Sequence, residues 1–206
     1  MLHACEALLA TPPNGFHIFA NLFKYHAACY LTHAAIEAAG TLRRRHAVDP
    51  DRIRRVELRV DPSVLGVCNV AAPRTGLEGK FSLRATTAMA LLGHDTADPG
   101  TFTDARMADP ALVRLRDRVS VIPVAGTGPT RTTVIVETEG GRFEAAADTG
   151  VPATDVGAQR ERLTGKFLAL AVPVLGRAGA EALAGAALRV HQLGEGAELL
   201  RLARAR

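Results

Sequence analysis

Apolar residues recur at two spacings along the chain, and each spacing predicts a kind of element. Between residues 55 and 60, valine and leucine alternate with arginine and glutamate, which is the two-residue period of a strand with one buried face. From Thr32 onward, apolar residues recur every three or four positions, which predicts a helix that Thr32 caps with its hydroxyl and that continues through Gly40. Residues 2–10 also have helical character, and the TPPNG sequence after them predicts its end.

The middle of the chain contains a segment rich in glycine and proline, followed by two helical patterns. Residues 62–80 retain apolar side chains among the glycines and prolines, which predicts a long, ordered loop with a functional role. Residues 81–93 and 109–119 predict helices, because Ser82 and Asp109 are residues that cap helix N-termini and a glycine ends the first pattern.

Three strands are predicted next, and helical periodicity then returns. The strands cover residues 119–124, 130–139 and 141–149, and Gly140 and Gly141 predict a tight hairpin between the last two. The last part of the chain predicts helices at residues 158–176, 179–193 and 194–206.

This order of elements predicts the fold class. Strands and helices do not alternate one by one, so we expect an α+β fold with a small, mostly antiparallel sheet packed with helices. We divide the chain into a helical segment at residues 1–45, an α+β domain at residues 46–155 and C-terminal helices at residues 156–206.

Composition indicates a globular, cytoplasmic protein. Of 206 residues, 48% are hydrophobic and 22% are charged, which is ordinary for a soluble domain. No stretch reaches the roughly 18 consecutive apolar residues of a membrane helix, and no basic region precedes the apolar start as in a secretory signal. Three widely spaced cysteines without a CxxC motif indicate neither a disulfide framework nor a zinc ribbon.

The formal net charge of +4 arises from arginine clusters at residues 43–46, 51–55 and 201–206. A nucleic-acid-binding surface would need stacking aromatics between such clusters, and the chain has no Trp and two Tyr. We therefore expect no nucleic-acid partner and interpret the arginines as solvated groups near helix ends.

The richest chemistry lies in residues 24–38, KYHAACYLTHAAIEA. His26, Cys29 and His33 have a spacing that could hold a metal, but the fourth ligand of a structural zinc site is not nearby, so we predict no metal. A Cys29–His33 nucleophilic pair is conceivable, yet no third group that would orient it is evident.

A carboxylate-binding site explains the same residues better. The first turn of a helix has unpaired N–H groups and a positive dipole end, so Lys24, His26 and His33 around it would bind anions and shuttle protons. Lys80 and Arg84 flank a second predicted helix start at Ser82. Two such sites suit a di- or tricarboxylate ligand.

Two of these stretches are similar to signature segments of the MmgE/PrpD family, which includes 2-methylcitrate dehydratase and cis-aconitate decarboxylase. They are KYHAACYLTHAAIEA at residues 24–38 and TGLEGKFSLRATTAMALLG at residues 75–93. Residues 102–121 and 163–176 resemble segments that follow in that family, in the same order.

The resemblance implies a cofactor-independent, metal-free lyase fold, with the active site between a large helical domain and a smaller α+β lid. Lys24, Cys29 and His33 match polar positions of the first segment, and Lys80 and Ser82 match the second. Lys24 and His33 are thereby expected to be catalytic, and His26, Cys29, Lys80, Ser82 and Arg84 to bind substrate.

Family members are about twice as long, and the resemblance covers their C-terminal half. We therefore expect the lid half of a lyase for a small polycarboxylate, acting as a homo-oligomer or with a separate N-terminal helical subunit. Ala85 stands where members often carry a tyrosine, a departure from the pattern of the dehydratases and decarboxylases. An epimerase or isomerase of the same family is an alternative, since proton abstraction next to a carboxylate serves all three chemistries. The other alternative is a non-catalytic interaction or regulatory module.

Overall fold

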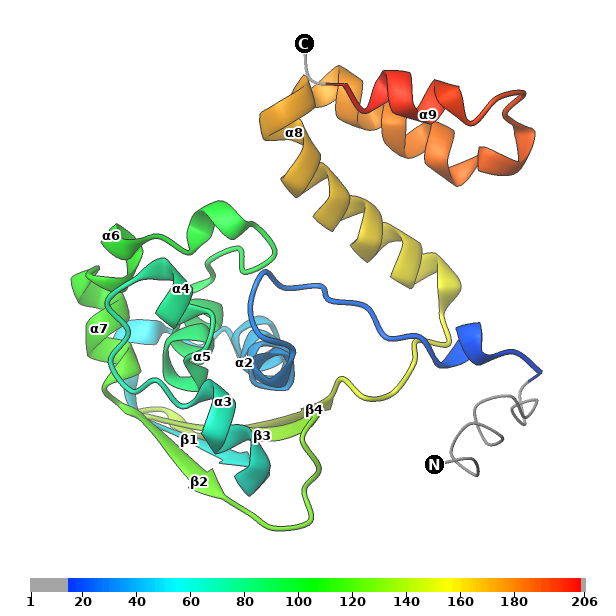
Figure 1. Cartoon of the computed structure of the whole chain (residues 1–206). Coiled ribbons are helices and arrows are strands. Elements are labelled where there is room, and N and C mark those ends of the chain that lie inside the picture. The colour runs from blue at the N-terminus through cyan, green and yellow to red at the C-terminus, as the bar shows by residue number, and fades with distance from the viewer. Residues whose placement is uncertain (1–14, 205–206) are drawn as a thin grey trace.

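A computed structural model describes residues 15–204 and contains a four-stranded sheet with helices over one face (Figure 1). The sheet has the order β2-β1-β3-β4. Its strands are β1 (Ile53–Val60), β2 (Val119–Pro123), β3 (Arg131–Thr138) and β4 (Gly141–Asp148). Strand β1 pairs in parallel with β2, whereas the β1–β3 and β3–β4 pairs are antiparallel. The predicted α+β class, with a small and mostly antiparallel sheet, is confirmed.

Strand β1 has the buried face that its sequence pattern predicts. Its side chains Val56 and Leu58 are fully buried beneath the helices. On the opposite face Glu57 pairs with Arg55 and with Arg59, whose Nε lies 2.8 Å from the carboxylate. Alternation along this strand therefore separates the core from solvent.

Helices α2 (His33–His46) and α5 (Leu83–Leu92) form the layer over the sheet. Helix α2 packs on β3 and β4, and α5 packs on α2 and in turn on α7 (Pro110–Arg116). Buried alanines on α2 allow this close approach from two sides. The three-segment division of the chain stays a prediction; in the structure, α2 from the first segment packs on strands of the second.

The predicted helix caps have mixed outcomes. Ser82 Oγ accepts the Ala85 N–H at 3.1 Å, and Gly93 ends α5 in a left-handed conformation, as predicted. The predicted cap at Thr32 is wrong, because its hydroxyl instead donates to the Cys29 carbonyl at 2.8 Å. A 3-10 turn, η2 (Tyr30–Thr32), precedes α2, so the Thr32 backbone is already helical. Its side chain therefore points toward the preceding turn and not toward the first N–H groups of α2.

The predicted loop at residues 62–80 is wrong in part, because it contains three short helices. They are η4 (Pro62–Val64), α3 (Leu65–Cys68) and α4 (Gly76–Gly79). One-turn helices show no apolar periodicity, although the capping box of Thr75 and Glu78 marks the start of α4. Other short helices are η1 (His17–Ala20), η3 (Pro50–Arg52), η5 (Pro99–Thr101) and α6 (Asp104–Met107).

The C-terminal helices extend away from the α+β body (Figure 1). Helix α8 (Val156–Leu188) breaks at Gly176, where φ is 69° and ψ is 163°, and after η6 (Val190–Gln192) helix α9 (Ala197–Leu202) packs back on it. By length and composition alone α8 is long and apolar enough to cross a membrane, but its backbone is not helical at Gly176. The helix predicted at residues 2–10 lies outside the described residues.

Candidate functional site

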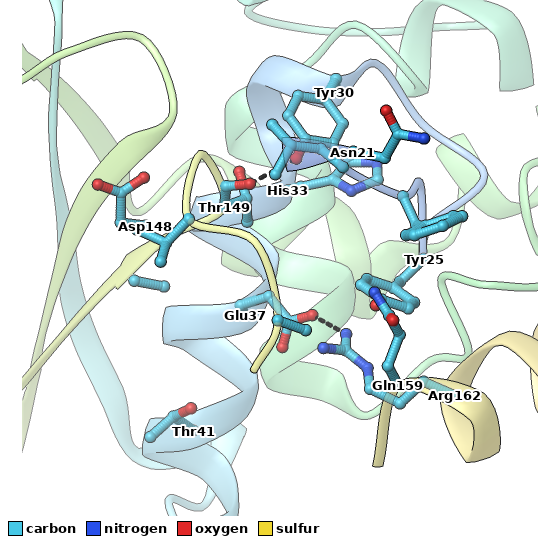
Figure 2. Close-up of a pocket in the computed structure, with 15 residues that line it drawn as sticks. Asn21, Tyr25, Tyr30, His33, Glu37, Thr41, Asp148, Thr149, Gln159 and Arg162 are labelled. Atoms are coloured by element: carbon cyan, nitrogen blue, oxygen red, sulfur yellow. Dashed lines mark hydrogen bonds and ion pairs between the residues drawn. The ribbon is translucent and has the colours of Figure 1, made fainter. Parts of the chain in front are cut away.

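A cavity of about 380 Å³ opens where the segment before α2, the end of β4 and the start of α8 meet (Figure 2). The side chains that matter for its chemistry are Tyr25, Tyr30, His33, Glu37, Gln159 and Arg162. Residues from both ends of the described chain thus line one space.

His33, the first residue of α2, is the buried group of this cavity, with 1% of its surface exposed. Its ring hydrogen-bonds to the Ala28 backbone, whereas its Nε2 is buried and has no partner among the described residues. Burial is the largest cause that lowers the pKa of His33, and the charges of His26, Lys24 and Lys166 add to it; the hydrogen bond with Ala28 acts the other way, and the resulting pKa is about 3. The imidazole is therefore neutral, and one of its nitrogens makes no hydrogen bond to the described residues.

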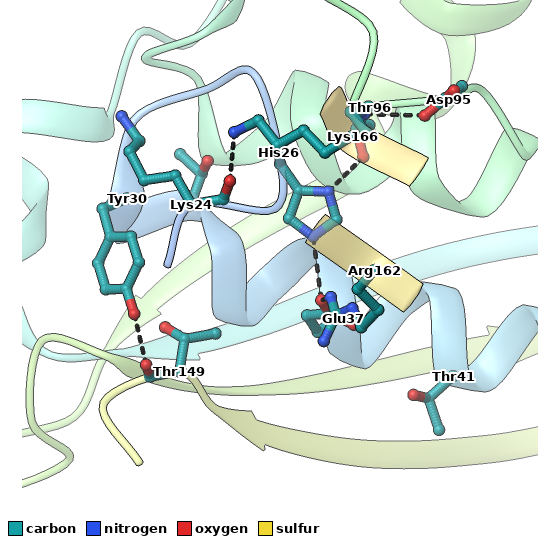
Figure 3. A network of polar contacts seen from close by, with 12 residues as sticks. Lys24, His26, Tyr30, Glu37, Thr41, Asp95, Thr96, Thr149, Arg162 and Lys166 are labelled. Carbon is teal, nitrogen blue, oxygen red and sulfur yellow. Dashed lines mark hydrogen bonds and ion pairs between the residues drawn. The ribbon is translucent and has the colours of Figure 1, made fainter. Parts of the chain in front are cut away.

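A chain of polar contacts runs beside His33 (Figure 3). Nδ1 of His26 lies 2.7 Å from the Thr96 hydroxyl, and its Nε2 lies 3.2 Å from Glu37 Oε1. Glu37 also accepts a hydrogen bond from Arg162. Burial raises the pKa of Glu37, but the hydrogen bonds and charges of His26 and Arg162 outweigh it and lower the pKa to about 2. Glu37 is therefore ionised.

Helix α8 supplies cations to the site. The Arg162 guanidinium lies 3.7 Å from the centre of the Tyr25 ring, a cation–π contact. One turn later, Lys166 Nζ donates a hydrogen bond to the Lys24 carbonyl. Burial lowers the pKa of Lys166, and the charge of Lys24 lowers it further. Among residues 15–204, neither lysine forms an ion pair with a carboxylate.

The wall opposite α8 is fixed by a single side chain. The Tyr30 hydroxyl donates to the Thr149 carbonyl at 2.5 Å, which ties the end of β4 to the turn before α2. The Tyr30 ring also lies 4.9 Å from the His33 ring. This contact positions the imidazole between two fixed segments.

Of the residues predicted from the first motif, His33 lines the cavity and Lys24 and His26 lie next to it. Lys24 is exposed, and its backbone carries the contact to α8. Cys29 instead lies against the buried Cys68, whose thiol it hydrogen-bonds. Among the described residues no group of three or more His, Cys, Asp or Glu is arranged to hold a metal.

The second motif joins the first through its backbone. The Cys29 N–H donates to the Lys80 carbonyl at 2.9 Å. The Lys80 amine lies 5.7 Å from the centre of the Phe102 ring, and Arg84 donates to Asn69 at 2.7 Å. Ser82 is fully buried as a cap. None of the three lines the cavity, so their predicted role in binding substrate stays a prediction.

Sequence reasoning missed Glu37, Arg162 and Lys166. Glu37 lies four residues after His33, one helical turn along α2, and that spacing could have identified it. The two α8 residues are separated from the motif by the whole sheet, and no local pattern indicates their approach.

A family model matches most of the chain. Residues 26–192 match the MmgE/PrpD C-terminal domain, which is well over half of the 206 residues. No curated protein matches the chain. The match includes the first motif from His26 onward, the second motif, the sheet and most of the C-terminal helices, so the chain belongs to the MmgE/PrpD family and contains its C-terminal domain.

Proposed function

We propose that this chain is the C-terminal, lid-containing half of an MmgE/PrpD-type lyase that acts on a small di- or tricarboxylate. One observation carries the proposal: His33, whose buried Nε2 has no partner among the described residues, lines a cavity together with Arg162, and the charges of Lys24 and Lys166 act on the same imidazole. A neutral imidazole beside several cations suits chemistry at a carbon next to a carboxylate.

In this proposal Lys24, Lys166 and Arg162 bind the substrate carboxylates. Both lysines lower the pKa of His33, so a bound carboxylate that neutralises them raises the proton affinity of the imidazole. His33 Nε2 then accepts the proton from the carbon next to a carboxylate, and the electron pair spreads into that carboxylate. The cations stabilise the charge that develops.

This first step serves more than one reaction of the family. Loss of hydroxide from the neighbouring carbon completes a dehydration, and delivery of a different proton, from solvent or a second acid, to the opposite face completes an epimerisation. In a decarboxylation the bond to a carboxylate breaks first, CO₂ leaves and the resulting carbanion takes a proton. Dehydration or decarboxylation is our leading proposal.

Exposed apolar surface supports a second subunit. The segment before the first motif exposes Phe16 by 69% and Phe19 by 60%, and α8 exposes Val174 by 62%. Apolar patches of this kind mark protein interfaces. We propose that an N-terminal helical subunit, or another copy of the chain, covers them and completes the site. The lid half alone is then inactive.

Titration calorimetry with citrate and smaller dicarboxylates tests the proposal, on the chain alone and with whatever protein co-purifies from its native host. We expect Lys24→Ala to abolish carboxylate binding while the melting temperature changes by a few degrees at most, because Lys24 is exposed. The matched variant Lys24→Arg keeps the charge and should retain part of the affinity. If no carboxylate binds to either form, the alternative of a non-catalytic interaction module is favoured.

A further inference from the structure

A second cavity, of about 200 Å³, lies between the C-terminal halves of α2 and α5. Helix α2 contributes Gly40, Arg43 and Arg44 to its wall, and Gly93 and His94 come from the end of α5. Arginine side chains lie over both glycines, Arg44 over Gly40 and Arg43 over Gly93. The proposed lyase function does not use this cavity.

Two arginines line this cavity, and neither has an acid partner among the described residues. The Arg43 guanidinium covers Gly93 so closely that a Cβ there would lie 2.6 Å from its central carbon. The Arg44 side chain folds over Gly40, and within the described part of the chain it makes one long side-chain hydrogen bond, of 3.5 Å, to Thr41 Oγ1. Within residues 15–204, no carboxylate forms an ion pair with either arginine.

The cavity therefore has surplus positive charge. Its acid, Glu37, is already engaged by His26 and Arg162. Arginines on the strand face of the protein differ in this respect, since Arg54 and Arg59 each pair with a glutamate. Attraction to a helix C-terminus explains cations near the ends of α2 and α5, but it does not explain two guanidiniums that border one cavity.

We propose that this cavity binds a small tetrahedral oxyanion, either inorganic phosphate or the phosphate end of an ester, between Arg43 and Arg44. Each guanidinium is a planar fork that donates to two oxygens, so two forks need more acceptors than one carboxylate offers, and a phosphate supplies them. The imidazoles of His94 and His26 border the same space and offer further contacts.

The position of this site links it to the candidate active site. His26 borders the oxyanion cavity and hydrogen-bonds Glu37, which borders both cavities. An oxyanion that draws His26 toward itself weakens the contact between His26 and Glu37. Phosphate binding is therefore expected to alter the candidate site without occupying it.

The proposal is tested by calorimetry and thermal melting of the full chain. Both measurements compare inorganic phosphate with chloride at the same ionic strength. We expect saturable binding that Arg43→Gln or Arg44→Gln weakens roughly tenfold or more, as is usual for lost charge-assisted hydrogen bonds. Arg45→Gln is the matched control, because Arg45 belongs to the same arginine run but does not border the cavity. Binding should change less than twofold in that variant, which is about the scale of a long-range charge effect.

Two results would overturn the proposal: no saturable binding of phosphate beyond the effect of chloride, or an equal loss of affinity in Arg45→Gln. Methyl phosphate distinguishes a phosphate ester from inorganic phosphate as the ligand. If methyl phosphate binds as tightly as inorganic phosphate, the cavity accepts an ester; if it binds more weakly, the ligand is free phosphate. Lys24→Ala should leave phosphate binding unchanged, so failure here is distinguishable from failure of the proposed lyase function. As a second readout, the ring NMR signals of His94 should move with phosphate while those of the distant His191 stay fixed.

Discussion

The Arg162 guanidinium lies 3.7 Å above the Tyr25 ring and also pairs with Glu37, which is 125 positions earlier in the chain. This contact fixes the start of α8 over the first motif. Because Tyr25 and Glu37 flank His33, one side chain from α8 defines the mouth of the cavity. The candidate site therefore depends on where α8 lies as much as on the motif itself.

Arg162→Gln should weaken carboxylate binding roughly tenfold while costing little stability. The cation–π contact and the ion pair are partly exposed, and each is worth about 1 kcal/mol or less in such a setting. Arg162→Lys keeps the charge but loses the fork and the stacking, so its affinity should be intermediate. Calorimetry gives the affinities and thermal melting gives the stabilities; unchanged affinity in Arg162→Gln would remove Arg162 from the proposed site.

The pH dependence of stability should report on His33. Its pKa is about 3 in the folded chain against an ordinary value of 6.5, so below pH 6.5 the unfolded chain binds a proton that the folded chain does not. The free energy of unfolding should therefore fall as the pH drops from 6.5 toward 3. Glu37, whose pKa falls from 4.5 to about 2, contributes in the same direction, but only below about pH 4.5.

Urea unfolding of His33→Asn between pH 7 and about pH 4.5 isolates the contribution of His33. Asparagine can keep a donor toward the Ala28 carbonyl, and the variant should show a flatter slope than the parent chain. Burial also lowers the pKa of His94, so His94→Gln is the parallel control for a second histidine in that window. Identical slopes for His33→Asn and the parent would show that His33 is not held neutral by the fold.

The cysteines beside the first motif should differ in reactivity. Cys68 is fully buried, and burial with the contact to Cys29 raises the pKa of its thiol to about 12, so it stays protonated at neutral pH. Cys29 is partly exposed. Iodoacetamide at pH 8 should therefore label Cys29 well before Cys68, as peptide mass spectrometry would show. Equal labelling rates in the folded chain would contradict the burial of Cys68.

The sequence predicted the sheet well because each strand follows a local rule. Strand β1 alternates apolar and charged residues along its length, and glycines mark the hairpin between β3 and β4. That hairpin turns at Glu139 and Gly140, one residue earlier than predicted, since Thr138 pairs with Gly141. Such rules act over a few residues and therefore appear in the sequence.

The candidate site could be predicted only in part, because half of it is assembled over long distances. His33 and Lys24 belong to a compact motif, but Arg162 and Lys166 reach the motif only after the sheet has formed and α8 has turned back. For Ser82, by contrast, the local sequence allowed two interpretations. Its position in a recognisable motif suggested substrate binding, whereas its hydroxyl is buried in a cap, a geometry that the sequence predicted equally well.

A glycine in the second motif should be required for packing. A Cβ at Gly76 would lie 2.1 Å from the Phe102 carbonyl oxygen, which is backbone and cannot move aside cheaply. The Gly76 N–H also donates to Asp104 at 2.8 Å, so α4 is held at this distance. Gly76→Ala should lower the free energy of unfolding by roughly 1–3 kcal/mol, the usual cost of overpacking. Gly66→Ala is the matched control, since no atom lies within 4 Å of a Cβ there and alanine favours the helix α3. Urea unfolding should show a loss in the first variant and none in the second; equal stability of both would mean that α4 does not pack against the backbone around Phe102.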